Sequence, residues 1–251
     1  MTIDLKTRGA RPAGVEGEEE ISRWVRRMFD GVAPRYDMLN HLLSFQTDRY
    51  WRWRTVRLLD AYLRRPAARV VDLCCGSGDL TLALQARGAA TVAGSDFSHE
   101  MLRAARRKAE ARRLPPLLFE ADALRLPVPD ASLDLVTAAF GFRNLVDYGR
   151  GLVEMHRALR PGGAAAILEF STPPNAQFRR IYDFYSRHVL PKIGAWISGA
   201  PEAYEYLPDS VRKFPGAEAL AEQMRAHGFV DVRFHRMTFG IVALHIGVKR
   251  G

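Results

Sequence analysis

Residues 70–81 read VVDLCCGSGDLT and contain the transition that decides the fold. An apolar run over 70–73 leads into small residues over 74–78, and a helix-like sequence follows from Asp79. At such a corner glycines let the backbone approach a ligand, and the free N–H groups of the helix start face the crevice. The stretch therefore predicts a ligand-binding corner, with a tight strand–helix turn that binds nothing as the alternative.

Short apolar runs alternate with amphipathic stretches around and beyond this corner. We expect strands over 69–74, 91–96, 116–122, 132–140 and 163–170, and helices over 79–87, 99–113 and 147–160. A helix over 217–228 then precedes two apolar runs, over 229–235 and 240–249, which are most simply an antiparallel hairpin. The pattern predicts an α/β, Rossmann-like fold, with a mostly parallel seven-stranded sheet, helices on both faces and an antiparallel C-terminal hairpin.

The remaining segments are expected to frame a single domain over residues 20–251. Residues 1–19 are polar and contain glycine and proline, so they predict a frayed tail. Residues 20–64 read as an N-terminal helical cap that precedes the first strand. Segment 174–215 is long for a connection, which is typical of a lid or a substrate-side binding element.

The composition of the 251 residues restricts the class of protein. No apolar run reaches the roughly 18 residues that a membrane-spanning helix needs. The net charge of +9 favours an acidic partner such as nucleic acid or anionic lipid, although a solvated arginine-rich surface explains it equally well. Cys74 and Cys75 are adjacent and fit neither a disulfide framework nor a metal site. Because the N-terminus lacks a signal-peptide pattern, we expect a cytoplasmic protein, and we expect no bound metal.

Acidic residues near the corner indicate which ligand it binds. Asp96 ends the next expected strand, twenty residues after Gly76, where it can accept hydrogen bonds from a ribose diol. A dinucleotide fingerprint needs a third glycine where Thr81 stands, so a pyrophosphate is disfavoured. The D-x-x-x-G-x-G arrangement of Asp72, Gly76 and Gly78 instead resembles motif I of class I methyltransferases, which bind S-adenosylmethionine.

From about residue 22 to residue 249 the chain resembles the ubiquinone/menaquinone biosynthesis C-methyltransferases. The matching segments include MFDGVAPRYDMLNHLLSF (28–45), FGFRNLVD (140–147), LRPGGAAAILEFSTP (159–173), YDFYSRHVLPKIG (182–194) and YEYLPDSVRKFP (204–215). The resemblance implies a class I methyltransferase fold, S-adenosylmethionine as cofactor and C-methylation of a prenylated hydroquinone. It leaves two substrates open, demethylmenaquinol and a benzoquinol precursor of ubiquinone, and it favours demethylmenaquinol.

The same resemblance assigns the cofactor contacts. They follow the first three expected strands, with Ser77 in the glycine turn, Asp96 at the ribose, and Asp122 with Ala123 at the adenine. Asp72 and Asp79 are expected near the methionine end of the cofactor, and hydrogen bonding within the turn and the helix cap is the alternative for both.

Methylation at carbon constrains the substrate side of the site. A hydroquinone ring carbon attacks well only while a ring hydroxyl loses its proton, so the site must stabilise a phenolate and align carbon, methyl and sulfur. In FGFRN, we expect Arg143 to stabilise the phenolate or orient a water and Asn144 to hold that water, while Tyr36 closes the network. Pairing of Arg143 with a carboxylate such as Asp147 is the alternative.

Three residues of segment 174–215 are candidates for substrate contact. His188 is a second candidate base, although a lone histidine is more often structural. Tyr206 and Ser210 are expected at the quinol head group.

The prenyl tail of the expected substrate makes a membrane a candidate partner. Within RYWRWRTVR (49–57), Trp51 and Trp53 alternate with arginines, which suits an anionic lipid interface at the inner face of the cytoplasmic membrane. Packing of the tryptophans on the sheet is the alternative. We expect no nucleic-acid partner, and a homodimer is left open. The competing functions are an RNA methyltransferase and a non-catalytic basic binding module.

Overall fold

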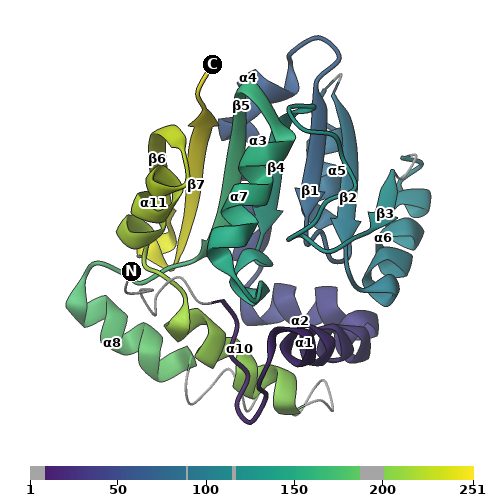
Figure 1. Ribbon diagram of the computed structural model, residues 1–251. Coiled ribbons are helices and arrows are strands. Elements are labelled where there is room, and N and C mark those ends of the chain that lie inside the picture. The colour runs from purple at the N-terminus through teal and green to yellow at the C-terminus, as the bar shows by residue number, and fades with distance from the viewer. Residues whose placement is uncertain (1–8, 89, 115–116, 187–200) are drawn as a thin grey trace.

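The computed structural model describes residues 9–88, 90–114, 117–186 and 201–251. These residues form one sheet of seven strands in the order β3-β2-β1-β4-β5-β7-β6 (Figure 1). The strands are β1 (Arg69–Leu73), β2 (Thr91–Asp96), β3 (Leu118–Glu120), β4 (Leu133–Ala139), β5 (Leu159–Phe170), β6 (Phe229–Met237) and β7 (Val242–Lys249). Strands β1 to β5 are parallel, and β7 is antiparallel to both β5 and β6. The mostly parallel sheet with an antiparallel C-terminal hairpin is therefore confirmed.

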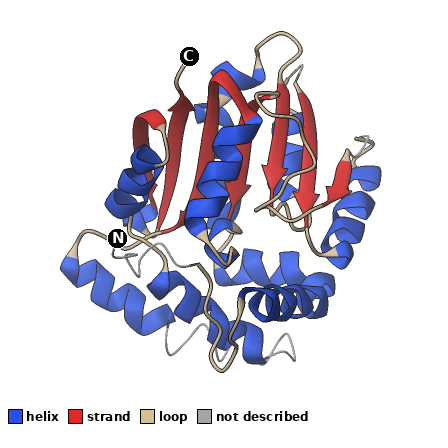
Figure 2. Cartoon of the chain, viewed as in Figure 1, coloured by secondary structure: helices blue, strands red, loops and turns tan. Residues whose placement is uncertain are grey.

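Helices cover the sheet on both faces (Figure 2). They are α1 (Glu18–Val32), α2 (Tyr36–Leu43), α3 (Thr47–Leu58), α4 (Asp60–Leu63), α5 (Asp79–Gln85), α6 (His99–Ala111), α7 (Tyr148–Ala158), α8 (Ala176–Phe184), α10 (Pro201–Lys213) and α11 (Ala217–Ala226). Short 3-10 turns are η2 (Ala33–Arg35), η3 (Phe142–Asn144) and η5 (Thr238–Gly240). Among the described residues no helix is long and apolar enough to cross a membrane.

Two apolar clusters hold the helices against the sheet. Val70 and Val71 are neighbours on β1 but belong to different clusters, because successive strand residues point to opposite faces. The cluster around Val71 includes side chains of α7 and α11, which lie in front of the sheet in Figure 1. The cluster around Val70 includes side chains of α3 and α5 behind it. This two-sided burial explains the nearly continuous apolar runs of the central strands.

The carboxyl edge of the parallel strands carries a further layer. In Figure 1, α1, α2, α8 and α10 lie below the tips of the strands. The N-terminal helices predicted over 20–64 therefore lie in two places. Helices α1 and α2 lie at this edge, whereas α3 packs on a face of the sheet. The described helices of segment 174–215, α8 and α10, meet α1 and α2 at the same edge, where ligands bind in open α/β sheets.

The backbone of Gly9 and Ala10 pairs with residues 145–146, within the stretch 1–19 where a frayed tail was expected. The amide of Gly9 donates to Val146 O at 3.1 Å, and the amide of Ala10 donates to Leu145 O at 2.7 Å. A Cβ added at Gly9 would lie 1.8 Å from Leu145 O, so only glycine permits this approach. The expectation is thus wrong for Gly9 and Ala10. The reason is that two small residues that pair through their backbone give no periodic pattern of apolar side chains, so the sequence does not predict their packing.

Several element boundaries differ from the expected ones. The helix expected over 147–160 ends at Ala158, and Leu159 already pairs with Leu133 of β4 in the parallel ladder. The ladder shifts register between Leu133 and Leu135, and β5 begins at Leu159 and not at the expected residue 163. The strand expected over 116–122 is described only as Leu118–Glu120.

Candidate active site

In the glycine turn after β1, three alternate residues have left-handed backbone conformations. Cys74, Gly76 and Gly78 have φ values of 50°, 54° and 82°, and α5 begins directly afterwards. A Cβ added at Gly141 would lie 2.3 Å from Cys74 Cβ, and one added at Gly94 would lie 3.0 Å from Cys75 Sγ. Close packing against neighbouring strands therefore requires small residues here, which accounts for the two cysteines. Burial raises the pKa of both thiols, so they stay protonated.

The first of two cavities at the carboxyl edge lies beside Asp96, and we call it the Asp96 cavity. Its lining includes Phe97, Met101, Asp122, Ala123 and Leu124. Asp96 Oδ2 accepts a hydrogen bond from the Gly76 amide at 2.8 Å, and Oδ1 accepts one from the Ser98 amide at 2.9 Å. Burial raises the pKa of Asp96 to about 6. Of the predicted cofactor residues, Gly76, Asp96, Asp122 and Ala123 thus meet in one place.

Asp72 lies within the sheet, next to the turn. Its two carboxylate oxygens accept hydrogen bonds from the hydroxyls of Thr81, at 2.7 Å, and Thr137, at 2.6 Å. Burial raises its pKa to about 6. These contacts agree with hydrogen bonding within the turn, and a contact of Asp72 with the cofactor remains a prediction.

The second cavity, which we call the aromatic cavity, has a volume of about 300 Å³. Its lining rings belong to Phe29, Tyr36, Phe45, Trp51, Phe140, Phe170, Tyr182, Tyr185 and Tyr206. It shares Phe29, Tyr36, Cys74, Gly76 and Phe140 with the Asp96 cavity, so the two spaces meet beside the glycine turn. A volume near 300 Å³ suits a small ring system.

The carboxylates of the Asp96 cavity match an adenosyl sulfonium better than a dinucleotide. Asp96 and Asp122 line this cavity, whereas Asp79, which lines the aromatic cavity, is paired with Arg52 and Lys108. Carboxylates attract a sulfonium cation and repel a pyrophosphate. Gly76 leaves space for a ligand, because a Cβ there would project toward Tyr36 Cε1, 3.7 Å away, across the junction of the cavities. The described residues thus fit S-adenosylmethionine.

An ion-pair network joins the glycine turn to the N-terminal helices. Ser77 Oγ donates to Asp37 Oδ1, and Lys108 Nζ donates to Ser77 Oγ at 3.0 Å and to Asp79 Oδ1 at 2.6 Å. Arg52 Nη2 lies 3.2 Å from Asp79 Oδ2. Ser77 and Asp79 are therefore fixed by helices α2, α3 and α6 as well as by the turn itself.

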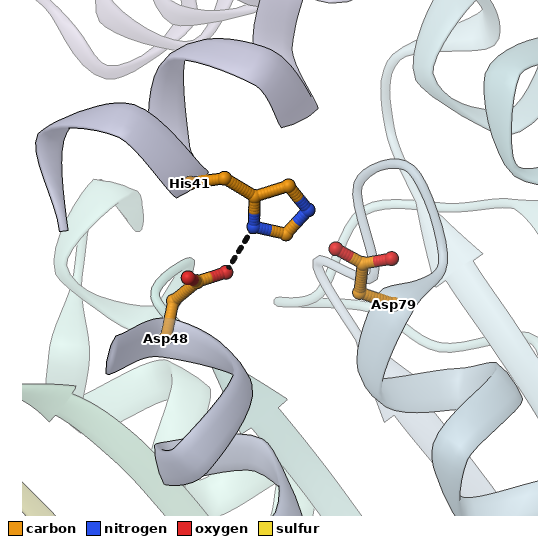
Figure 3. A group of neighbouring side chains, drawn as sticks. All are labelled: His41, Asp48 and Asp79. Carbon is orange, nitrogen blue, oxygen red and sulfur yellow. Dashed lines mark hydrogen bonds and ion pairs between the residues drawn. The ribbon is translucent and has the colours of Figure 1, made fainter. Parts of the chain in front are cut away.

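His41, Asp48 and Asp79 converge beside this network (Figure 3). Their ligand atoms are close enough to hold a metal ion, and His41 Nδ1 lies 2.7 Å from Asp48 Oδ2. However, Arg52 pairs with both carboxylates and Lys108 pairs with Asp79. Two cations already neutralise the two acids, so we assign the group to ion pairing.

Arg143 is buried in the wall of the aromatic cavity. Its Nη1 lies 3.0 Å from Glu169 Oε1, and the side chains are 7% and 1% exposed. The alternative of pairing with a carboxylate therefore holds, but the partner is Glu169. Asp147 was the wrong candidate, because its Oδ1 accepts from the Arg150 amide at 2.9 Å and caps α7. Burial raises the pKa of Glu169, while Glu169 raises that of Arg143, so the guanidinium stays charged.

Glu169 was missed by sequence reasoning. The available signal was a single carboxylate at the end of the apolar run AAAILEF, residues 164–170. A charge in such a run is rarely tolerated unless it is paired, and its position at the carboxyl end of β5 directs it to the site edge.

The remaining predicted substrate residues gather around Arg143. Tyr206 donates its hydroxyl to Asn144 Oδ1 at 3.1 Å, and Arg143 Nε donates to Ser210 Oγ at 3.3 Å. Asn144 Nδ2 is buried without a hydrogen-bond partner among the described residues. Burial raises the pKa of Tyr36, which keeps its hydroxyl protonated. His188 lies outside the described residues.

The chain was compared with known families, sequences and structures. The model of the ubiE/COQ5 methyltransferase family matches residues 16–249. A demethylmenaquinone methyltransferase of Thermus thermophilus is 51% identical over 88% of this chain and 99% of that sequence. One of Deinococcus radiodurans is 46% identical over 94% and 97%, and one of Geobacillus stearothermophilus is 41% identical over 90% and 97%.

Solved structures share the fold at low identity. A SAM-dependent methyltransferase of Thermotoga maritima has a TM-score of 0.62 at 18% identity and covers 89% of this chain and 99% of its own. Phosphoethanolamine N-methyltransferase 2 of Haemonchus contortus, in complex with S-adenosyl-L-methionine, has a TM-score of 0.57 at 15% identity and covers 79% and 52%. From the family match and the relatives, the chain belongs to the ubiE/COQ5 methyltransferase family and is an S-adenosylmethionine-dependent methyltransferase.

Proposed function

We propose that the chain methylates a ring carbon of demethylmenaquinol, a prenylated naphthoquinol, where the two cavities meet. The proposal is supported by the relatives named demethylmenaquinone methyltransferase, which are 41% to 51% identical over most of their length. The observation that carries it is the buried Arg143–Glu169 pair in the wall of an aromatic cavity beside the glycine turn. A fixed guanidinium in the wall of an aromatic cavity suits a substrate that must become a phenolate.

Arg143 is the group that would face the developing phenolate. Its Nε and Nη1 are engaged by Ser210, Phe140 and Glu169, and no hydrogen bond reaches its Nη2 among the described residues. The guanidinium cannot act as a base at neutral pH. It therefore stabilises charge, and Glu169 holds it in position and keeps the empty site close to neutral.

Asn144 and Tyr206 would handle the hydroxyl proton. The hydroxyl of Tyr206 fixes Asn144 through Oδ1, so that Nδ2 is left to donate to a water or to the quinol oxygen. Such a water accepts the proton from the ring hydroxyl as the phenolate forms. Tyr36 lies at the junction of the cavities with a neutral hydroxyl, which orients the ring.

The cofactor side needs only binding and alignment from the protein. Bound S-adenosylmethionine supplies an electrophilic methyl group on its sulfonium sulfur. Asp96 would accept from the ribose hydroxyls, and Asp122 with Ala123 would contact the adenine. Asp72, Asp79 and Ser77 would surround the methionine end, and the cavity junction beside Tyr36 would align sulfur, methyl and ring carbon.

The decisive experiment is transfer of a labelled methyl group to demethylmenaquinone that has been chemically reduced. The reduced quinone should be methylated, whereas the oxidised quinone should not, because it has no hydroxyl to ionise. The benzoquinol precursor of ubiquinone and bulk RNA form parallel arms. If the benzoquinol or RNA were methylated faster than reduced demethylmenaquinone, it would take the place of the proposed substrate.

The proposal extends to where the protein works. An insoluble prenyl tail requires contact with a membrane, and we place the protein in the cytoplasm at the inner face of the cytoplasmic membrane. Of the two tryptophans expected at the lipid interface, Trp51 is 3% exposed and packs in the core, and Trp53 is 55% exposed. The alternative of packing thus holds for Trp51. A homodimer remains a prediction.

A further inference from the structure

Four large apolar side chains are exposed around the aromatic cavity. Among the described residues, Phe239 and Phe45 are the most exposed of their kind, at 78% and 74%, and Ile181 and Phe184 follow at 67% and 64%. We call these four residues the mouth patch. Phe45 itself lines the aromatic cavity, and Tyr182 and Tyr185 line it from the helical turns that carry Ile181 and Phe184. The patch therefore borders the opening of the cavity.

Contacts between three segments hold the mouth patch together. The hydroxyl of Tyr185 donates to Leu43 O at 3.1 Å, and the Phe45 and Tyr185 rings are 5.9 Å apart. At the other end of α8, the Phe178 and Phe239 rings are 5.1 Å apart. Helix α8 thus bridges from the α2–α3 turn to η5, and none of its residues is buried.

The backbone holds the two phenylalanines in uncommon conformations. Phe45 and Gln46 have φ values of 51° and 63°, and Thr238 and Phe239 have values of 48° and 55°. Left-handed backbone is disfavoured for bulky residues, and it persists where the surrounding fold enforces it, often at functional sites. In both turns the result is a phenyl ring that faces solvent, where it contributes little to the core.

The charges beside the mouth patch select the kind of partner. The exposed charged side chains of α8, and of the first turn of α3 that follows Phe45, are arginines: Arg179, Arg180 and Arg49. Exposed apolar rings flanked by arginines match an anionic lipid surface, because the rings enter the headgroup region while the cations meet phosphate.

We infer that the mouth patch docks the protein on an anionic lipid bilayer, so that the quinol ring enters the aromatic cavity while the prenyl tail stays in the membrane. The inference rests on the proposed quinol substrate, and it names a surface centred on the mouth patch rather than on the tryptophans of the stretch 49–57. In this arrangement Phe45 marks the boundary between the cavity and the lipid.

Vesicle flotation with the full chain tests the docking surface. The vesicles are phosphatidylcholine alone, or phosphatidylcholine with about a third phosphatidylglycerol. The double variant Phe184→Ser/Phe239→Asn removes two rings that line neither cavity, and asparagine tolerates the left-handed turn at 239. Val153→Ser is the matched control, because Val153 is 56% exposed on α7 over a face of the sheet.

The wild type and the control should bind anionic vesicles, and the double variant should bind at least about tenfold more weakly. All three should bind S-adenosylmethionine equally and methylate a water-soluble, short-tailed quinol at the same rate. The short-tailed assay tests the proposed function separately, because flotation does not depend on turnover. The inference is overturned by a wild type that floats with neither vesicle, or by a double variant that floats unchanged. Conversion of a dimer to a monomer by the double variant, with no change in flotation, would identify a protein interface and also overturn it.

Discussion

Compared with the aromatic cavity, the Asp96 cavity takes its glycine turn and its two carboxylates from a short span of sequence, residues 76–122. Gly76 and Asp96 lie at the ends of neighbouring strands β1 and β2, and Asp122 follows β3. The groups of the aromatic cavity come from positions as distant as Tyr36, Arg143 and Tyr206. Strand order places the carboxylates of the first cavity, although Phe29 and Tyr36 of the N-terminal helices also line it. The second cavity depends on the N-terminal helices, α8 and α10 over the sheet edge. Changes in the two cavities should therefore affect cofactor affinity and turnover separately.

The largest effect is expected for Arg143→Ala. Loss of the guanidinium removes the charge that faces the phenolate, so kcat should fall about 10²- to 10³-fold, or about 3–4 kcal/mol. The dissociation constant for S-adenosylmethionine should stay unchanged, because the Arg143 side chain bonds to Ser210, Phe140 and Glu169 and to none of the residues that would hold the cofactor. Initial rates at saturating cofactor and calorimetric titration measure the two quantities.

Loss of Arg143 also leaves Glu169 buried without its cation, which costs about 3–5 kcal/mol of stability. The double variant Arg143→Met/Glu169→Gln removes both charges and keeps an acceptor oxygen for one of the two backbone amides, at positions 143 and 170, that donate to Glu169. Its melting temperature should recover relative to Arg143→Ala, while kcat stays low. Recovery of turnover together with stability would make Arg143 a structural residue and remove its assignment.

The second largest effect is expected for Asp96→Asn. The carboxylate accepts from two backbone amides, and an asparagine directs an NH₂ group at one of them. The glycine turn should shift and the ribose should lose a charged acceptor, so cofactor affinity should fall about 10- to 100-fold. The turnover of saturated enzyme should change much less. Asp231→Asn, at an exposed position with φ 50°, is the control and should change neither value.

The difference between the cavities also explains what the sequence could predict. The strand order and the convergence of Gly76, Asp96 and Asp122 follow from residues that sit directly after strands, where the parallel topology fixes their edge. The partner of Arg143 did not follow, because Glu169 lies 26 positions away and meets it only through the pairing of β4 with β5. Asp147, closer in sequence, was the natural candidate, but its carboxylate caps α7. The packing of Gly9 and Ala10 was hidden for a similar reason, because it rests on backbone contacts.

A smaller effect is expected for Tyr206→Phe, which sharpens the contrast within the aromatic cavity. The variant removes the hydroxyl that donates to Asn144 Oδ1 and leaves the ring in place. Loss of one neutral hydrogen bond corresponds to about 0.5–1.5 kcal/mol, so kcat should fall about 2- to 10-fold. Tyr62→Phe, on α4 in the core behind the sheet, is the matched control. An unchanged kcat in Tyr206→Phe would show that Asn144 does not depend on this hydroxyl.

The smallest effect is a pH dependence that separates cofactor affinity from stability. Burial raises the pKa of both Asp72 and Asp96 from 3.8 to about 6. As the pH falls through 6, these carboxylates become protonated and accept less well from the cofactor, so affinity at pH 6 should be about two- to fourfold weaker than at pH 8.

The free energy of unfolding should change in the opposite direction. Between about pH 6 and pH 4 the folded state binds these protons more readily than the unfolded state, so the two groups raise the free energy of unfolding as the pH falls. Calorimetric titration of the cofactor and urea unfolding across this range should therefore give opposite slopes, and in Asp96→Asn the part of both slopes that belongs to Asp96 should disappear.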